Sequence, residues 1–110
     1  MPFIALEVAI DLIAKLQPVL VLIRRHDPGL ADQARRASQS NALALSEGGS
    51  RTGREQLRFW RAALGSVTEL RDSLRVAIAS HYLAERDLAD LAPVLDRSRA
   101  LDWGLVHRRR

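Results

Sequence analysis

Apolar residues recur every three or four positions along most of this 110-residue chain, which is the spacing that places side chains on one face of an α-helix. The clearest run contains Leu57, Trp60, Ala63, Leu64, Val67, Leu70, Leu74 and Ile78. The pattern predicts four helices, over about residues 3–25, 28–47, 53–80 and 84–107. The length suits one domain spanning residues 1–110, and 47% hydrophobic but only 5% aromatic residues are typical of an all-α bundle.

Signals for the ends of these helices stand at the predicted connections. Asp27 followed by Pro28 predicts an N-cap and a first helical residue. Pro18 and Pro93 fall inside predicted helices, so we expect each to kink its helix or to divide it into two segments.

A glycine-rich turn separates the second helix from the third. The second helix is expected to end near Glu47, because Gly48 and Gly49 can adopt the left-handed conformation that closes a last turn. Thr52 and Glu55 have capping-box spacing, which predicts that the third helix starts there.

The most specific pattern flanks this turn. Before it stand Gln33, Arg35, Arg36, Ala37, Ser40, Glu47 and Gly48, and after it Phe59, Arg61, Ala63, Gly65, Ser66, Glu69 and Leu70. With this spacing the chain resembles the bacterial four-helix bundle proteins, also known as 23S ribosomal RNA intervening-sequence proteins. It departs from them at Asn41, Ala42 and Ala44, where the family tends to have isoleucine, proline and asparagine. Any role of the family asparagine would therefore be absent or fall to Asn41.

The resemblance implies an antiparallel up-down four-helix bundle that assembles into a closed ring, commonly a pentamer. A related accessory protein of diversity-generating retroelements is a basic ring that binds a reverse transcriptase and nucleic acid. The partners implied are therefore further copies of the chain, RNA or DNA, or an enzyme similar to a reverse transcriptase.

The charge of the chain agrees with a nucleic-acid partner, because 17 basic and 13 acidic residues give a net charge of +4. The candidate nucleic-acid-binding residues lie around the central turn, and they are Arg35, Arg36, Arg51, Arg54, Arg58 and Arg61. The alternative is a solvated face with intrahelical ion pairs such as Glu55 with Arg58, on a purely structural oligomer with a protein partner.

Structural roles are expected for the other residues of the pattern. Glu47 and Glu69 are predicted to pair with Arg35, Arg36 or Arg61 between the second and third helices, and Gly65 and Ser66 to let a neighbouring helix approach closely. Phe59 and Trp60 are predicted to pack rather than to stack on bases. Asn41 is expected to be buried, with partners on its own helix or on the third.

Little in the chain predicts catalysis, and we expect no enzyme activity, cofactor or metal. There is no cysteine, and the three histidines are far apart in the sequence. Arg75 and His81 resemble the R-x4-6-H motif of the HEPN ribonucleases, which leaves a weak ribonuclease as a further alternative. The N-terminal apolar run is interrupted by charges and Pro18, so it predicts neither a membrane span nor a signal peptide, and we expect a cytoplasmic protein.

Overall fold

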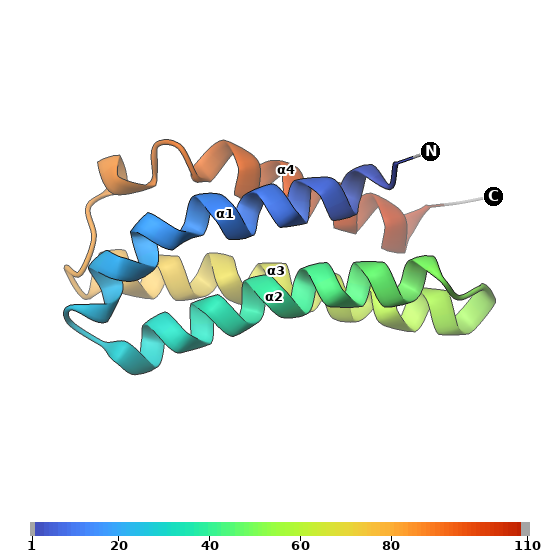
Figure 1. Ribbon diagram of the computed structural model, residues 1–110, viewed down its shortest axis with the longest axis horizontal. Coiled ribbons are helices and arrows are strands. Elements are labelled where there is room, and N and C mark those ends of the chain that lie inside the picture. Colours follow the sequence, from blue (N-terminus) through green and yellow to red (C-terminus); the bar gives the residue numbers. More distant parts are fainter. Residues whose placement is uncertain (1, 109–110) are drawn as a thin grey trace.

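The computed structural model describes residues 2–108 and is built from helices, with no strand in that range (Figure 1). The helices are α1 (Ile4–Arg24), α2 (Pro28–Gly49), α3 (Gly53–Ala79) and α4 (Ala92–His107), with a short 3-10 helix, η1 (Glu85–Leu88), before α4. Each helix packs on the next, and α4 packs back on α1, in a bundle of 44 × 23 × 20 Å. The all-α prediction is confirmed. Met1, Arg109 and Arg110, the outermost residues of the predicted domain, lie outside the described range.

The first connection follows the sequence signals. The Asp27 carboxylate accepts a hydrogen bond from the Leu30 N–H at 3.0 Å, and Pro28 opens α2. Pro18 does not divide α1, which continues to Arg24 and bends toward α2 in its C-terminal part (Figure 1). Pro18 and Ala14 are both exposed, so water can bind the Ala14 carbonyl that lacks its helical donor.

The glycine-rich turn differs from its prediction. Helix α2 continues through Gly48 to Gly49, and the left-handed residue is Gly53, with φ of 58°. The Thr52 side chain makes no capping hydrogen bond, so the predicted capping box is wrong. Since Gly53 is left-handed, the backbone after Thr52 departs from ordinary N-cap geometry. The Gln56 amide closes the turn instead, donating to the carbonyls of Gly48 at 3.1 Å and Arg51 at 2.8 Å.

The last predicted helix, residues 84–107, forms as two segments, which is one of the two outcomes expected from Pro93. The Asp87 carboxylate accepts from the Ala84 N–H at 2.9 Å and holds this segment as the 3-10 helix η1. Helix α4 begins only at Ala92, which places Pro93 in its first turn. A proline there loses no helical hydrogen bond, so Pro93 starts the helix rather than kinking it.

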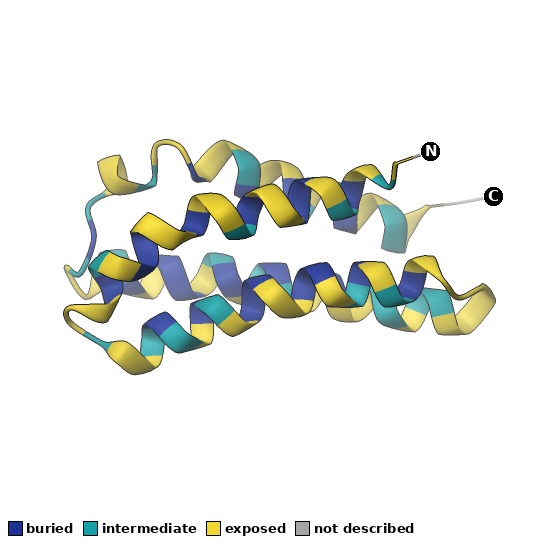
Figure 2. Ribbon diagram, in the orientation of Figure 1, coloured by how far each residue is buried: buried dark blue, intermediate teal, exposed yellow. Residues whose placement is uncertain are grey.

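The core consists of two apolar clusters separated by a polar layer. The residues of the larger cluster include Leu12, Leu16, Ile23, Val67, Leu70, Leu74, Leu91 and Leu95, and the smaller contains Ala5, Ala9, Ala42, Leu45 and Ala63. The polar layer is formed by Asn41, Ser98 and Asp102, all fully buried. Figure 2 shows the buried positions on the helix faces that point into the bundle.

Within residues 2–108, no helix combines the length and the apolar character needed to cross a membrane.

Candidate nucleic-acid interface

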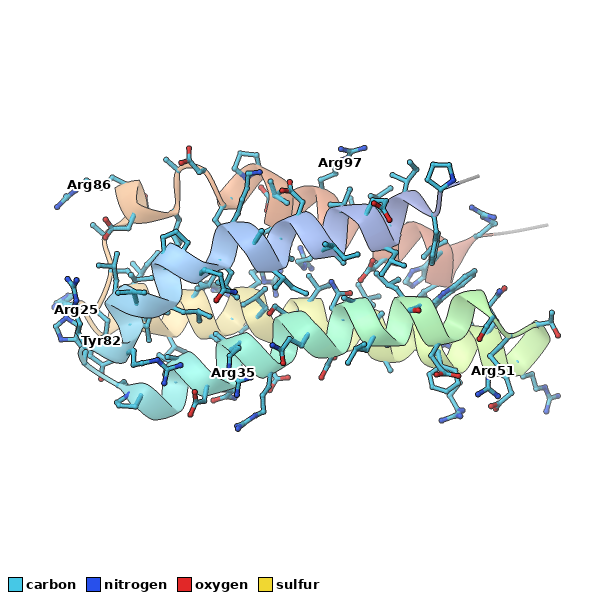
Figure 3. The ribbon with its side chains drawn as sticks, viewed as in Figure 1. Arg25, Arg35, Arg51, Tyr82, Arg86 and Arg97 are labelled. Carbon is cyan, nitrogen blue, oxygen red and sulfur yellow. The ribbon has the colours of Figure 1, made fainter. Side chains whose placement is uncertain are left out.

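The six candidate arginines fall into two groups. Arg54, Arg58 and Arg61 lie at positions i, i+4 and i+7 of α3, and with Arg51 in the preceding turn they form an exposed row that we call the arginine stripe. Arg35 and Arg36 lie on α2, about 24 Å before Arg51 along the helix axis. Figure 3 shows Arg35 and Arg51 well apart along the bundle. The candidate residues at the two extremes of the predicted group therefore do not lie side by side.

Half of the arginine stripe is ion-paired within its own helix or turn. Arg51 donates to Glu47 Oε2 through Nε at 3.1 Å, and Arg58 donates to Glu55 Oε1 through Nη2 at 3.1 Å. The hydrogen bond and the positive charge of Arg58 hold the pKa of the Glu55 carboxyl below its usual value. These pairs are exposed to solvent, which screens the attraction between the charges, so a phosphate can replace the carboxylate at little cost.

The other two members of the stripe, Arg54 and Arg61, form no ion pair with any residue between 2 and 108. Both are exposed and share one helix face. Arg36 also lacks a carboxylate partner within the described chain, whereas the Nε atom of Arg35 lies 3.9 Å from Asp32 Oδ1. The structure thus contains both kinds of arginine that the sequence suggested: intrahelical pairs and free cations.

The two aromatic residues next to the arginine stripe, Phe59 and Trp60, pack against neighbouring side chains. The guanidinium groups of Arg51 and Arg58 lie 5.5 and 4.6 Å from the centre of the Phe59 ring. Trp60 packs on Phe3, with ring centres 5.9 Å apart, and on Gly48, where a Cβ atom would lie only 2.6 Å from Trp60 Cδ1. Gly48 is therefore required by the close approach of the indole ring rather than by a left-handed backbone.

Three structural roles predicted for the family pattern are wrong within the chain. A Cβ atom added at Gly65 would meet nothing within 4 Å, and the residue is exposed, so no helix packs closely there. Glu47 pairs with Arg51 in its own turn, and Glu69 accepts from Gln33 across the α2–α3 seam at 3.4 Å. Neither carboxylate pairs with Arg35, Arg36 or Arg61, because Asp32, Gln39 and solvent surround those arginines instead.

The buried polar layer is the feature that sequence reasoning missed. In the amide orientation that satisfies both ends, Asn41 Nδ2 donates to Asp102 Oδ2 at 2.5 Å and to the Ala63 carbonyl at 3.3 Å. Asn41 Oδ1 then faces the Ser98 hydroxyl at 3.3 Å. The predicted partner on α3 is therefore confirmed, but two partners from α4 were not foreseen. The spacing of Leu91, Leu95, Ser98 and Asp102 could have revealed that they share one buried face.

Burial raises the pKa of the Asp102 carboxyl from 3.8 to about 7. Asp102 Oδ1 has no hydrogen-bond partner among residues 2–108, and no cation pairs with the carboxylate in that range. The ionised form is consequently poorly stabilised in the core.

The residues of the possible ribonuclease motif, Arg75 and His81, have different surroundings. Arg75 donates to Asp72 at 3.3 Å, while His81 is exposed in the turn after α3, with φ of 64°. No hydrogen bond within the described chain joins them. Between residues 2 and 108 no three metal-binding side chains gather around a common point either.

The fold defines the class: a small all-α bundle whose core contains a polar layer at Asn41, Ser98 and Asp102. The chain belongs to the 23S rRNA-intervening sequence protein family, whose family model matches residues 4–101. The resemblance seen in the sequence is thereby confirmed over α1, α2, α3 and most of α4. No curated protein and no solved structure matches the chain.

Proposed function

We propose that this protein is a self-associating helical module that binds nucleic acid, or an enzyme acting on nucleic acid, through the arginine stripe. It acts by binding rather than by catalysis. The family fits an RNA-related role. The observation that carries the proposal is the pair Arg54 and Arg61, exposed on one face of α3 without carboxylate partners in the described chain.

The dimensions of the stripe suit a phosphate backbone. Arg54 and Arg61 are seven residues apart, which is about 10 Å along a helix axis. A row of this length can contact more than one phosphate of a nucleic-acid strand. Guanidinium groups bind phosphates in bidentate fashion without reading bases, and binding should therefore depend on salt more than on sequence.

The test compares two triple variants of equal charge. In the first, Arg54, Arg58 and Arg61 are changed to glutamine. In the matched control, Arg25, Arg86 and Arg97 are changed instead. These control arginines are exposed, form no ion pair within residues 2–108, and lie at the opposite end of the bundle or over α4 (Figure 3).

Fluorescence anisotropy with labelled RNA and duplex DNA over a salt series should show binding that weakens with salt, is lost in the stripe variant and persists in the control. Equal loss in both variants would mean that only net charge matters and would contradict a specific face. No binding at low salt would leave a scaffold with a protein partner. RNA cleavage that disappears in His81→Gln would overturn the non-catalytic assignment.

Self-association is supported by apolar side chains on the outside of the monomer. Ile10 and Val21 on α1, Leu43 on α2 and Val76 on α3 are between 51% and 70% exposed. A ring requires two different contact surfaces on each protomer, and these residues lie on several helices rather than on one. A pentamer would have five times the 12.3 kDa mass of the chain in light scattering. A mass of one chain at all concentrations would rule the ring out.

A further inference from the structure

Trp103 has an environment that core packing does not explain. It lies on α4 outside the buried face formed by Leu91, Leu95 and Asp102, and it is 56% exposed. His107, one turn later, stacks on the indole with ring centres 4.0 Å apart and an interplanar angle of 19°. A large aromatic side chain is therefore held in a fixed orientation while much of its surface remains open to solvent.

A groove lies beside this stacked pair, between the start of α1 and the end of α4. Its volume is about 590 Å³, and the residues that line it include Phe3, Ile4, Leu101, Trp103, His107 and Arg108. Pockets that hold small ligands have volumes of roughly 300–1,000 Å³ and apolar walls with a few polar groups. The groove thus combines apolar and aromatic residues with one arginine.

The charge at this end of the bundle favours an anionic ligand. Arg108 lines both this groove and a second hollow of about 190 Å³, which reaches Gly53 and Gln56 at the start of α3. No carboxylate among residues 2–108 lines either hollow, whereas two other hollows of the bundle are lined by Glu7 with Asp11 and by Glu69 with Asp72. The α2–α3 turn and the end of α4 lie at the same end of the molecule (Figure 1). The groove and the start of the arginine stripe are therefore at the same end of the bundle.

We propose that this groove binds a base of a single-stranded nucleic acid, stacked on Trp103, while Arg108 and the arginine stripe contact the flanking phosphates. The inference rests on the proposed function and adds a strand preference to it. Bases in a duplex are already stacked and paired, so only a single strand can present one to an exposed indole. The stripe alone would bind both forms.

The test uses the full chain and a single-stranded uridine oligonucleotide, with a duplex RNA of equal length for comparison. Trp103→Leu should weaken single-strand binding on the order of ten- to a hundredfold and leave duplex binding unchanged. Trp103→Phe keeps a stacking ring and should restore most of the affinity. Gln17→Ala, an exposed substitution on α1 that lines neither hollow, should change neither affinity.

Fluorescence gives an independent readout. In a Trp60→Phe background Trp103 is the remaining tryptophan, and the single strand should quench its emission. Salt-dependent binding without quenching, and with equal affinity in Trp103→Leu, would overturn the base site while leaving the stripe intact. No binding to either nucleic acid would refute the proposed function itself. Protection of Trp103 from acrylamide in the free protein would show that another protomer covers it and would also overturn the site.

Discussion

Replacing Asp102 by asparagine should remove a pH dependence of folding that is built into the core. Asp102 is fully buried, Asn41 is its hydrogen-bond partner, and its second oxygen has none in the described chain. Burial raises the pKa of its carboxyl from 3.8 to about 7. Asparagine has nearly the same shape, can still accept from Asn41, and never ionises.

The sign and size of the effect follow from proton linkage. The folded state binds the Asp102 proton more tightly than the unfolded state, so the free energy of unfolding falls as the pH rises from about 4 to about 7. A pKa difference of roughly three corresponds to about 4 kcal/mol in total, of which roughly 2.5 kcal/mol lies between about pH 5 and pH 8. For a domain with a stability of about 5–15 kcal/mol, this is a large fraction.

Urea unfolding followed by circular dichroism, at fixed protein concentration and at several pH values over that interval, measures the effect. As the pH rises from about 5 to about 8, the free energy of unfolding of Asp102→Asn should increase by roughly 2.5 kcal/mol relative to that of the wild type. The exposed histidines are present in both proteins, so their contribution cancels. Asp96→Asn, an exposed substitution on the same helix, should leave the pH dependence of the wild type unchanged. Parallel pH profiles for wild type and Asp102→Asn would refute the reasoning.

Two further predictions concern packing and capping. Gly48→Ala should lower the free energy of unfolding by about 1–3 kcal/mol in urea titrations, because the added Cβ would meet the Trp60 ring. Gly65→Ala should instead raise the free energy of unfolding by about 0.5–1 kcal/mol, because the added Cβ would face open space and alanine favours a helix. An equal effect at both sites would contradict the close contact. Asp27→Ala should lower the melting temperature, because the loss of an N-cap hydrogen bond costs about 1 kcal/mol of stability. Thr52→Ala should change the melting temperature little, because the Thr52 side chain makes no capping hydrogen bond. A larger loss at Thr52 would show that its hydroxyl caps α3 after all.

Local signals in the sequence determined the helices and the first connection. The apolar spacing from Leu57 to Ile78 predicts α3 because a helix of that length needs one continuous buried face. Asp27 and Pro28 predict the start of α2 because capping depends on residues that are neighbours in the chain. The pattern around Gly48 predicted the family, although the reason for that glycine, contact with Trp60, is visible only in three dimensions.

Tertiary structure decided what depends on residues far apart in sequence. Asn41 and Asp102 are separated by 61 positions, and only the assembled bundle, in which α2 and α4 face each other across the core, makes them partners and raises the pKa of the carboxyl. The six arginines look like one group in the sequence, but Arg35 and Arg51 lie well apart along the bundle (Figure 3). The groove beside Trp103 exists because the start of α1 and the end of α4 meet. Spacing along a chain specifies helices and their faces, whereas burial, pairing and grooves arise from which faces come together.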